Sequence, residues 1–371
     1  MSEFLVEEAQ HGLGVSIKII GCGGGGGNMI NHMIKMGLND LDLIVANTDA
    51  QDLASSLAKT KIQLGEKKTR GRGAGMVPEV GAESARENFE ELKASLAQSD
   101  IVFIASGLGG GTGTGATPII AQAAKEVGAL TVSVVTMPFK FEGKPRTRLA
   151  EVGLEELKKE SDSILVIQNE KLLSLIDKKA SMKDSFKVVD DVLTNAVRGM
   201  VSILLNNGDI NVDFADVKTV MSHRGLALMG IGSAKGENAV NEAISNAIES
   251  PLLDGMDIKG AKGVILHFKT SSNCSFFEIA HAAEGVQELV DENAKIIFGT
   301  TTDDTMEDNV EVTIIATGFE NRASQANMEK ASEEKQNAKN PYINIKKVSG
   351  GYDEEMMSQL ETPAFLRRQM D

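Results

Sequence analysis

A ten-residue stretch with six glycines, Ser106 to Gly115, constrains the fold of this chain more than any other part of the sequence. It follows an apolar run, Asp100–Ala105, and precedes a segment with helical apolar spacing, Ala116–Val127. The order strand, glycine turn, helix puts a row of nearly bare backbone N–H groups at a helix N-terminus, which favours a bound phosphate. Thr112 and Thr114 add hydroxyl groups. The alternative is a flexible loop, although such loops usually carry two or three glycines.

A second glycine run has the same setting. Gly21–Gly27 follows the apolar strand Val15–Ile20 and precedes a helically spaced segment, Asn28–Met36. Because the run also fits the pattern GxGxxG, the dinucleotide site of an NAD-dependent Rossmann oxidoreductase is an alternative, with Asp49 as the ribose contact. That alternative leaves the run around Gly110 unexplained, and no evident His or Lys for hydride chemistry lies near the predicted site.

The order of the elements predicts how these runs are arranged. Apolar strands at 41–46, 100–105, 130–136 and 163–167 alternate with helical segments, which predicts right-handed βαβ units and a parallel sheet. Ligands of such sheets bind at the carboxyl ends of the strands. The segments of chemical interest all lie at such ends: Gly21–Asn28, Asn47–Asp49, Gly107–Gly115, Lys140–Arg146 and Asn169.

Some of these features also have plainer explanations. The basic, glycine-rich segment Lys61–Gly81 is typical of a solvated surface loop as well as of a phosphate contact. Glu142 and Arg146, four residues apart, form a surface ion pair if their segment is helical. Asn47 suits a base edge or a sugar, and equally a turn. A single helix is expected at Pro78–Ala97.

The second half of the chain has a different pattern. One long helix is predicted at Ser185–Asn206, and Asn211–Val217 then runs into another. From Arg224 to Phe319, β-rich segments enclose two helices, which predicts an α+β module with a mostly antiparallel or mixed sheet. After Glu320 the apolar pattern ends, as expected for a disordered linker.

Composition excludes several classes of protein. The 371 residues carry a formal net charge of −15, with no Trp and two Tyr, which disfavours nucleic-acid binding. Cys22 and Cys274 are the only cysteines and have no metal-binding spacing, which fits a reduced, intracellular setting. The sequence contains no signal peptide and no apolar run of about 18 residues, so direct membrane insertion is not expected.

Together these motifs resemble the tubulin/FtsZ superfamily of GTPases, and within it the FtsZ branch of bacterial cell division. The matching segments are Gly109–Gly115, which is similar to the signature loop of the superfamily, Gly23–Asn28, Asn47–Gln51, Phe141–Gly143 and Asn211–Asp216. The resemblance covers roughly residues 15–320 and returns at the C-terminal tail.

The resemblance implies an α/β fold, in which a Rossmann-like, parallel-sheet GTPase domain is joined by a long central helix to an α+β C-terminal domain. The implied divisions are a flexible arm at 1–14, a GTP-binding domain at 15–184, the central helix and catalytic loop at 185–222, an activation domain at 223–320, a disordered linker at 321–359 and a partner-binding tail peptide at 360–371.

The resemblance also implies the ligands, which are GTP or GDP with Mg²⁺. The implied phosphate contacts are Gly24, Gly25, Gly26, Gly27, Asn28, Gly110, Gly111, Thr112, Gly113, Thr114 and Gly115. Glu142 and Arg146 match ribose and phosphate contacts, and Asn47, Asn169, Phe186 and Asp190 match positions that surround the guanine. A carboxylate at Asp190 accepts two hydrogen bonds from guanine that adenine cannot donate.

Asp213 and Asp216 have two interpretations. Their spacing before an apolar helix is, by itself, a capping arrangement. The resemblance implies that this loop enters the nucleotide site of the next subunit, where both carboxylates are catalytic and polarise the attacking water. Hydrolysis of GTP would then require head-to-tail polymerisation.

The implied partners are further copies of the chain and, through Thr362–Arg368, membrane-tethering and regulatory division proteins. The implied location is the cytoplasm, at the mid-cell division site on the inner face of the membrane. A nucleotide-binding scaffold without enzymatic activity is the remaining alternative.

Overall fold

The computed structural model describes residues 15–319, except 39, 174–175, 177–178, 206–212, 224, 237, 251 and 254–257. The predicted arm, linker and tail peptide lie outside the described residues, as do Asn211 and Val212 of the predicted catalytic loop. Everything below concerns the described part of the chain.

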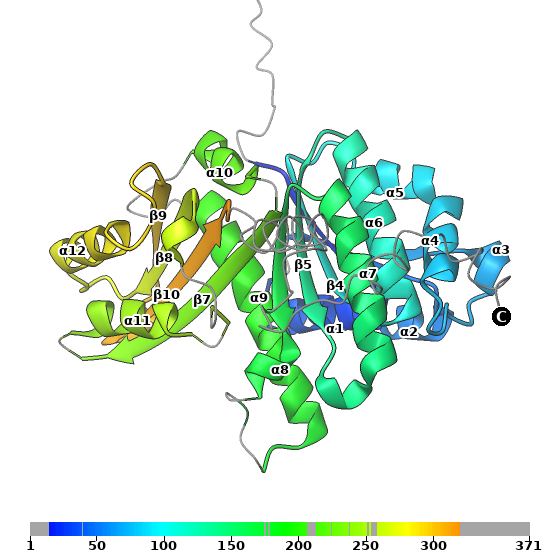
Figure 1. The fold of residues 1–371 in the computed structure, drawn as a ribbon, viewed down its shortest axis with the longest axis horizontal. Helices are drawn as coiled ribbons and strands as arrows, with labels where there is room; N and C mark the ends of the chain where they lie inside the picture. Colours follow the sequence, from blue (N-terminus) through cyan, green and yellow to red (C-terminus); the bar gives the residue numbers. More distant parts are fainter. Residues whose placement is uncertain are drawn as a thin grey trace, which may run out of the picture. The chain divides into compact units, whose positions relative to one another are not determined.

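Ten strands form one sheet in the order β3-β2-β1-β4-β5-β6-β7-β10-β8-β9 (Figure 1). The strands are β1 (Ile17–Cys22), β2 (Asp42–Asn47), β3 (Thr60–Gln63), β4 (Ile101–Gly107), β5 (Leu130–Met137), β6 (Ser163–Gln168), β7 (Gly225–Lys235), β8 (Gly263–Thr270), β9 (Lys295–Thr302) and β10 (Asn309–Thr317). Pairing is parallel from β3 through β7 and between β8 and β9, whereas β10 is antiparallel to both of its neighbours. The predicted parallel sheet and the mixed C-terminal sheet are both confirmed.

Strand β7 joins the two parts of the sheet, which the sequence did not predict. Its first residues, Gly225–Ala227, pair with Ser163–Leu165 of β6, and the rest of the strand pairs with β10. The parallel sheet therefore continues into the mixed one without a break in the hydrogen-bonded ladder.

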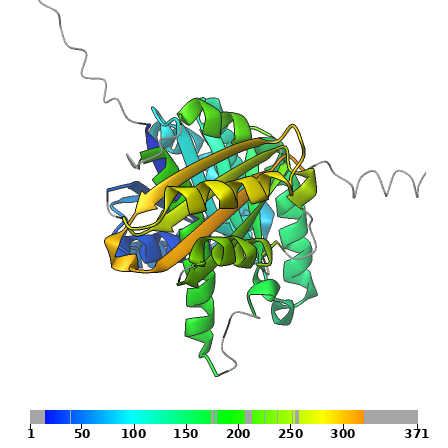
Figure 2. The ribbon, with the colours of Figure 1, turned by 90° about the vertical axis from the view of Figure 1, so that its left-hand side faces the viewer.

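Helices cover both faces of this sheet (Figures 1 and 2). They are α1 (Gly23–Lys35), α2 (Ala50–Ser55), α3 (Glu66–Thr69), α4 (Pro78–Glu87), α5 (Phe89–Leu96), α6 (Gly111–Glu126), α7 (Lys144–Glu160), α8 (Asn169–Leu172), α9 (Met182–Leu205), α10 (Phe214–Met221), α11 (Ala239–Ile248) and α12 (Phe276–Gln287). Three short 3₁₀ helices complete the described elements: η1 (Lys140–Glu142), η2 (Ile258–Gly260) and η3 (Asp304–Met306).

The period-2 alternation of the strands separates the core into layers. Ile19 of β1 packs with α1, α9 and α10, whereas the next residue, Ile20, packs with α4 to α7 on the opposite face. A third cluster lies between the mixed sheet and helices α11 and α12. Helix α9 contributes buried residues from Val189 to Ile203 to the first cluster, which also contains Ile265 and Ile315 of the mixed sheet. This long helix is therefore packed against both parts of the sheet.

Two glycine-rich helices begin earlier than the sequence predicted. Helix α1 starts at Gly23 and α6 at Gly111, so most of the glycines expected in the turns belong to the first turns of helices. Close packing requires glycine at these helix starts. A Cβ on Gly26 would overlap the carbonyl oxygen of Ala105, and a Cβ on Gly115 would overlap the carbonyl oxygen of Pro78. Only glycine lets these helix starts approach the neighbouring backbone.

The single helix predicted at Pro78–Ala97 is wrong, because Asn88 divides it into α4 and α5. The Asn88 side chain accepts a hydrogen bond from the Gly65 backbone N–H at 2.9 Å and donates one to Glu91 at 2.8 Å. The backbone of Asn88 (φ −105°, ψ 22°) lies outside the α-helical region, which ends α4 at this residue.

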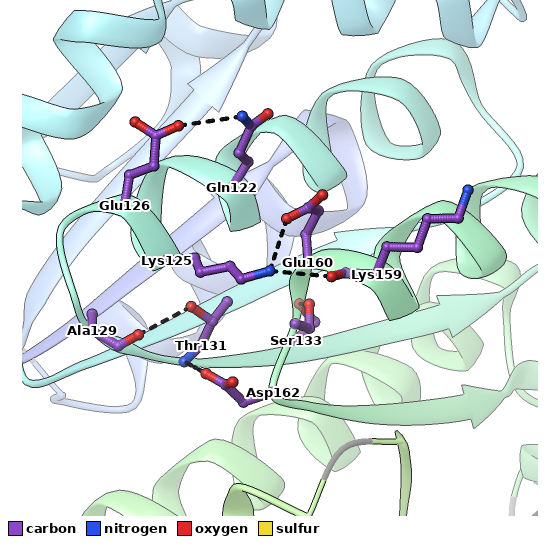
Figure 3. Close-up of polar contacts among 10 residues, drawn as sticks. Gln122, Lys125, Glu126, Ala129, Thr131, Ser133, Lys159, Glu160 and Asp162 are labelled. Carbon is purple, nitrogen blue, oxygen red and sulfur yellow. Dashed lines mark hydrogen bonds and ion pairs between the residues drawn. The ribbon is translucent and has the colours of Figure 1, made fainter.

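The amino ends of β5 and β6 are held by polar contacts remote from the strands' carboxyl ends (Figure 3). Asp162 accepts a hydrogen bond from the Thr131 backbone N–H at 2.9 Å. Nearby, Lys125 of α6 lies 3.3 Å from Glu160 of α7 and ties these helices together.

No helix in the described part of the chain combines the length and the apolar character needed to cross a membrane.

Replacing Gly115 with Ala tests the packing argument. The added methyl group would overlap the Pro78 carbonyl oxygen, so α6 and α4 must separate. We expect the free energy of unfolding to fall by about 1–3 kcal/mol, measured by urea denaturation.

Gly285→Ala is the matched control, because Gly285 also lies in a helix but has nothing within 4 Å of its Cβ position. This variant should gain about 0.5–1 kcal/mol from helix propensity. Equal effects of the two substitutions would contradict the packing explanation.

Candidate functional site

A cavity of about 420 Å³ opens at the carboxyl ends of the parallel strands, where the sequence placed its candidate residues. Its lining residues are Gly24, Gly25, Asn28, Gly75, Gly107, Leu108, Gly110, Gly111, Thr112, Gly113, Thr136, Pro138, Glu142, Arg146, Asn169, Phe186, Val189, Asp190 and Leu193. They come from the starts of α1 and α6, the ends of β4 and β5, the η1–α7 segment, α8 and one face of α9.

Two helix N-termini meet at the floor of this cavity. Strands β1 and β4 are paired so that Cys22 lies opposite Ser106, and the helices that follow them start side by side. A Cβ on Gly23 would lie 3.1 Å from the Gly113 backbone nitrogen. Neither helix has a side-chain cap or an acidic residue in its first turn. Their N-terminal N–H groups and helix dipoles can therefore act together on an anion.

Four of the predicted phosphate contacts do not line the cavity. Gly26 and Gly115 pack against neighbouring backbone, and Gly27 faces Val45. Thr114 is buried and accepts a hydrogen bond from the Gly109 N–H at 2.8 Å, so it shapes the turn. These four residues hold the helix starts in position, and the other predicted phosphate contacts form the cavity wall.

Thr112 has a second partner outside the cavity. Its hydroxyl lies 2.6 Å from the hydroxyl of Thr48, which follows β2.

The predicted base or sugar contact Asn47 does not line the cavity. Asn47 is buried, donates to the Asp52 carboxylate at 3.1 Å and accepts from the Asp49 N–H at 3.2 Å. In this structure Asn47 makes the contacts of a turn residue, which is one of the two roles expected from its sequence position.

One face of α9 forms the opposite wall. Phe186, Val189, Asp190 and Leu193 are spaced as i, i+3, i+4 and i+7, so they share a helix face and all line the cavity. The ring of Phe186 packs edge-on against the buried ring of Phe139, with 5.7 Å between centroids. This contact fixes an apolar ring beside a carboxylate, a combination suited to a flat ligand with N–H donors at its edge.

Asp190 is partly buried in this wall, and its surroundings raise the pKa of its carboxyl group. Burial is the largest cause of a pKa raised from 3.8 to about 6, and the neighbouring charge of Asp191 raises it further. His32 and Lys35 oppose these effects. A donor group of a ligand would stabilise the carboxylate and bring the pKa back down.

Asn169 supplies the clearest sign that a ligand belongs here. It is 5% exposed, lines the cavity and has a carboxamide oxygen with no hydrogen-bond partner. A buried acceptor without a partner is costly, and an N–H group of a ligand would satisfy it. A flat ligand with N–H donors along one edge would suit both this acceptor and Asp190.

Glu142 and Arg146 form an ion pair at the rim. The Arg146 guanidinium donates to the Glu142 carboxylate at 2.6 Å, and that carboxylate also accepts from the Phe139 N–H at 2.9 Å. Both residues line the cavity, and the Arg146 side chain is 44% exposed. Arg146 therefore offers positive charge to a ligand without leaving its partner.

Asp213 and Asp216 do not line this cavity. Both are exposed at the start of α10, where Asp213 caps the helix by accepting from the Ala215 N–H at 3.1 Å. The cavity is lined by the N-terminal part of α9, and α10 follows the C-terminal end of α9 in the chain. The part of α9 beyond Asp190 is itself roughly 20 Å long at 1.5 Å per residue.

Sequence reasoning missed several lining residues. Thr136 and Pro138 lie at the carboxyl end of β5, and the rule that placed the other loops there would have found them. Gly75 comes from the basic loop and accepts a hydrogen bond from the Gly111 N–H at 2.8 Å. No sequence pattern distinguishes Gly75 from the other glycines of that loop.

Comparison with known proteins gives consistent matches over both parts of the sheet. The model of the tubulin/FtsZ family GTPase domain matches residues 16–177, and that of the FtsZ family C-terminal domain matches residues 225–320. An FtsZ structure from M. jannaschii, described as an empty dimer, is 46% identical, with a TM-score of 0.78 over 82% of this chain and 88% of that one.

Two further structures are similar. A point mutant of the M. jannaschii protein is 46% identical, with a TM-score of 0.79 over 82% of this chain and 92% of that one. CetZ1 from Haloferax volcanii, described as a GDP-bound monomer, has a TM-score of 0.73 over 87% of this chain and its own full length. At 19% identity, this last match shows a shared fold alone.

Asp190→Asn tests the buried carboxylate. Because the folded-state pKa is raised from 3.8 to about 6, ionisation of Asp190 opposes folding, and this cost grows as the pH rises from 3.8 to about 6 and levels off above it. In nucleotide-free protein at pH 7.5, the Asn variant should be more stable by about 1–3 kcal/mol. The gain should shrink as the pH is lowered from 6 toward 4, followed by urea denaturation.

Asp184→Asn is the control on the same helix. The Ser181 hydroxyl lowers the pKa of the exposed Asp184, so its ionisation favours folding and the Asn variant should lose stability at pH 7.5. An Asp190→Asn variant no more stable than the wild type at pH 7.5 would contradict the assignment.

Proposed function

The chain belongs to the tubulin/FtsZ family of GTPases, and from this premise we propose that it polymerises head-to-tail into filaments of a division ring and hydrolyses GTP at the junctions between subunits. The family makes it a GTP-binding, GTP-hydrolysing cytoskeletal protein. The proposal concerns where in the assembly hydrolysis occurs and which residues carry it out.

One observation carries the proposal: the cavity and the candidate catalytic carboxylates lie at opposite ends of α9. Among the described residues that line the cavity, the carboxylates are Glu142 and Asp190. The first is paired with Arg146, and the second suits the base. A carboxylate that orients water at the terminal phosphate then has to come from another subunit, and Asp213 and Asp216 are exposed at the end that would face it.

The phosphates would be held mainly by backbone. The N-termini of α1 and α6, with Thr112 and Arg146, supply N–H groups, a hydroxyl and positive charge around the triphosphate. A Mg²⁺ ion bound to the phosphates would offset their remaining charge. Within the described residues no cluster of three or more His, Cys, Asp or Glu suited to a metal is found.

The base would be selected by the α9 wall. Asp190 would accept hydrogen bonds from guanine N1–H and its exocyclic amino group, the free acceptor of Asn169 would take a further donor, and Phe186 would pack against the ring. Adenine presents an acceptor where guanine presents N1–H, so it would leave Asp190 unpaired. Leaving a buried acceptor unpaired costs affinity, which favours GTP.

In the shared site, Asp213 and Asp216 of the incoming subunit would orient the attacking water. Phosphoryl transfer requires mainly positioning and stabilisation of charge, which two carboxylates opposite a wall of N–H groups can supply. In the isolated chain Asp213 caps α10, and a carboxylate that accepts one backbone hydrogen bond retains acceptor sites for water.

Self-association agrees with the description of the M. jannaschii FtsZ structure as a dimer. Attachment of the filament to the membrane through partners of Thr362–Arg368, and a cytoplasmic, mid-cell location, follow from the resemblance of the sequence. The tail peptide lies outside the described residues, so these two points rest on its sequence alone.

The alternatives account for less. An NAD-dependent oxidoreductase would use the α1 turn but would leave the second helix N-terminus without a role. A nucleotide-binding scaffold without activity would not need the exposed carboxylates of α10.

A concentration series separates these possibilities. The shared site predicts that GTP hydrolysis per molecule rises steeply above a threshold protein concentration, together with GTP-dependent light scattering. Hydrolysis per molecule that is independent of concentration would exclude the shared site, and absence of hydrolysis would favour a scaffold.

Asp213→Ala tests the split of roles. This variant should bind GTP normally, because Asp213 is remote from the cavity of its own chain, but its hydrolysis should fall by at least about 100-fold. Nucleotide binding is measured by equilibrium dialysis and hydrolysis by phosphate release.

Mixing provides the control. Asp213→Ala has an intact cavity, and Gly110→Asp, which puts a negative side chain into the cavity wall, has intact carboxylates. A mixture of the two inactive variants should regain part of the activity, because one junction type combines both intact halves. A mixture as inactive as its components would argue against shared sites.

A further inference from the structure

Helices α1 and α9, which both line the cavity, are joined by a contact outside it. Nε2 of His32, on α1, is 2.6 Å from Oδ1 of Asp191, on α9, which is an ion-pair distance without the geometry of a hydrogen bond. The histidine side chain is 13% exposed, so it occupies a defined place between the helices. The two helices carry different parts of the site: Gly24, Gly25 and Asn28 belong to α1, and Asp190 belongs to α9.

The position of His32 in the sequence makes this contact significant. His32 lies one helical turn beyond Asn28, which lines the cavity, and Asp191 directly follows Asp190. The contact therefore links Asp191, the neighbour of the candidate base contact Asp190, to α1. The N-terminus of α1 is the proposed phosphate-binding end. A change in the separation of α1 and α9 would move Asp190 relative to the phosphate-binding end of the cavity.

We infer that His32 is a positioning residue for guanine recognition: by binding Asp191 it holds Asp190 at the distance from the phosphate-binding helix that the nucleotide requires. The inference rests on the proposed contact between Asp190 and the base. His32 itself does not line the cavity.

The electrostatics of α9 support the same role. Burial and the charge of Asp191 disfavour the ionised form of Asp190, while positive charge on His32 and Lys35 favours it. His32 thus opposes the two effects that would protonate the base contact. By engaging Asp191, it also keeps that carboxylate directed toward α1.

Double-variant binding measurements test the inference with GDP as the probe, which avoids the polymerisation that GTP induces. His32→Ala should weaken GDP binding by about tenfold, measured by equilibrium dialysis on nucleotide-free protein. His32→Gln, whose amide can donate a hydrogen bond to Asp191 from the same place, should recover most of the loss. In an Asp190→Ala background, His32→Ala should change GDP affinity by less than about twofold, because the contact that it positions is already absent.

The inosine analogue IDP provides a base-specific readout. IDP lacks the exocyclic amino group, so less of its binding depends on Asp190, and His32→Ala should weaken IDP binding less than GDP binding. A purely structural role for His32 would instead weaken both nucleotides equally and would persist in the Asp190→Ala background. Either of these two results would overturn the inference.

Lys125→Ala is the matched control. Lys125 lies near the end of α6, whose start also lines the cavity, and pairs with Glu160 of α7 at 3.3 Å (Figure 3). It too ties a nucleotide-binding helix to a neighbour, but α7 carries no candidate base contact. This variant should keep wild-type affinity for GDP, and a loss like that of His32→Ala would make the effect a general one of helix packing, against the inference.

The proposed function can fail separately. Wild-type protein that binds ADP as well as GDP, or an Asp190→Ala variant with unchanged GDP affinity, would remove the proposed base contact itself. The protein could also show normal guanine preference that depends on Asp190 but does not change in His32→Ala. This result would leave the proposed function intact and reject only the role of His32.

Discussion

The parallel pairing of β1 with β4 is the constraint on which the site depends. Because these strands are neighbours, the helices that follow them start side by side, with Gly23 and Gly113 in close approach. Two uncapped helix N-termini then face one cavity, which gives a strongly acidic chain a local environment suited to phosphate. The same closeness leaves no room for side chains, so the glycines serve packing as much as binding.

Helix α9 separates the cavity from the two carboxylates that we propose as catalytic groups. Its first turns carry Phe186 and Asp190 into the cavity, and its length carries the chain away to α10, where Asp213 and Asp216 are exposed. In the proposed mechanism, a subunit built in this way presents half of a site at each end. Packing of α9 against both parts of the sheet keeps the two ends in a fixed relation, as a repeating junction requires.

Much of the site followed from simple rules. The carboxyl-end rule for parallel strands placed Asn169, Glu142 and Arg146 correctly at the cavity, and helical spacing put Phe186 and Asp190 on one face. The rules left the role open where a residue had more than one suitable task. Asn47 could contact a ligand or form a turn, and the structure gives it Asp52 and the Asp49 N–H as partners.

The sequence by itself determined the βαβ order, the two glycine-rich segments between strand and helix, and the family, because these depend on local spacing and residue type. Tertiary structure alone decided which glycines face the cavity and which face the core, that β7 joins the two parts of the sheet, and that His32 meets Asp191. Each of these depends on which segments become neighbours in space. Strand order and helix packing set those neighbours through contacts between residues far apart in the chain, and no local pattern encodes them.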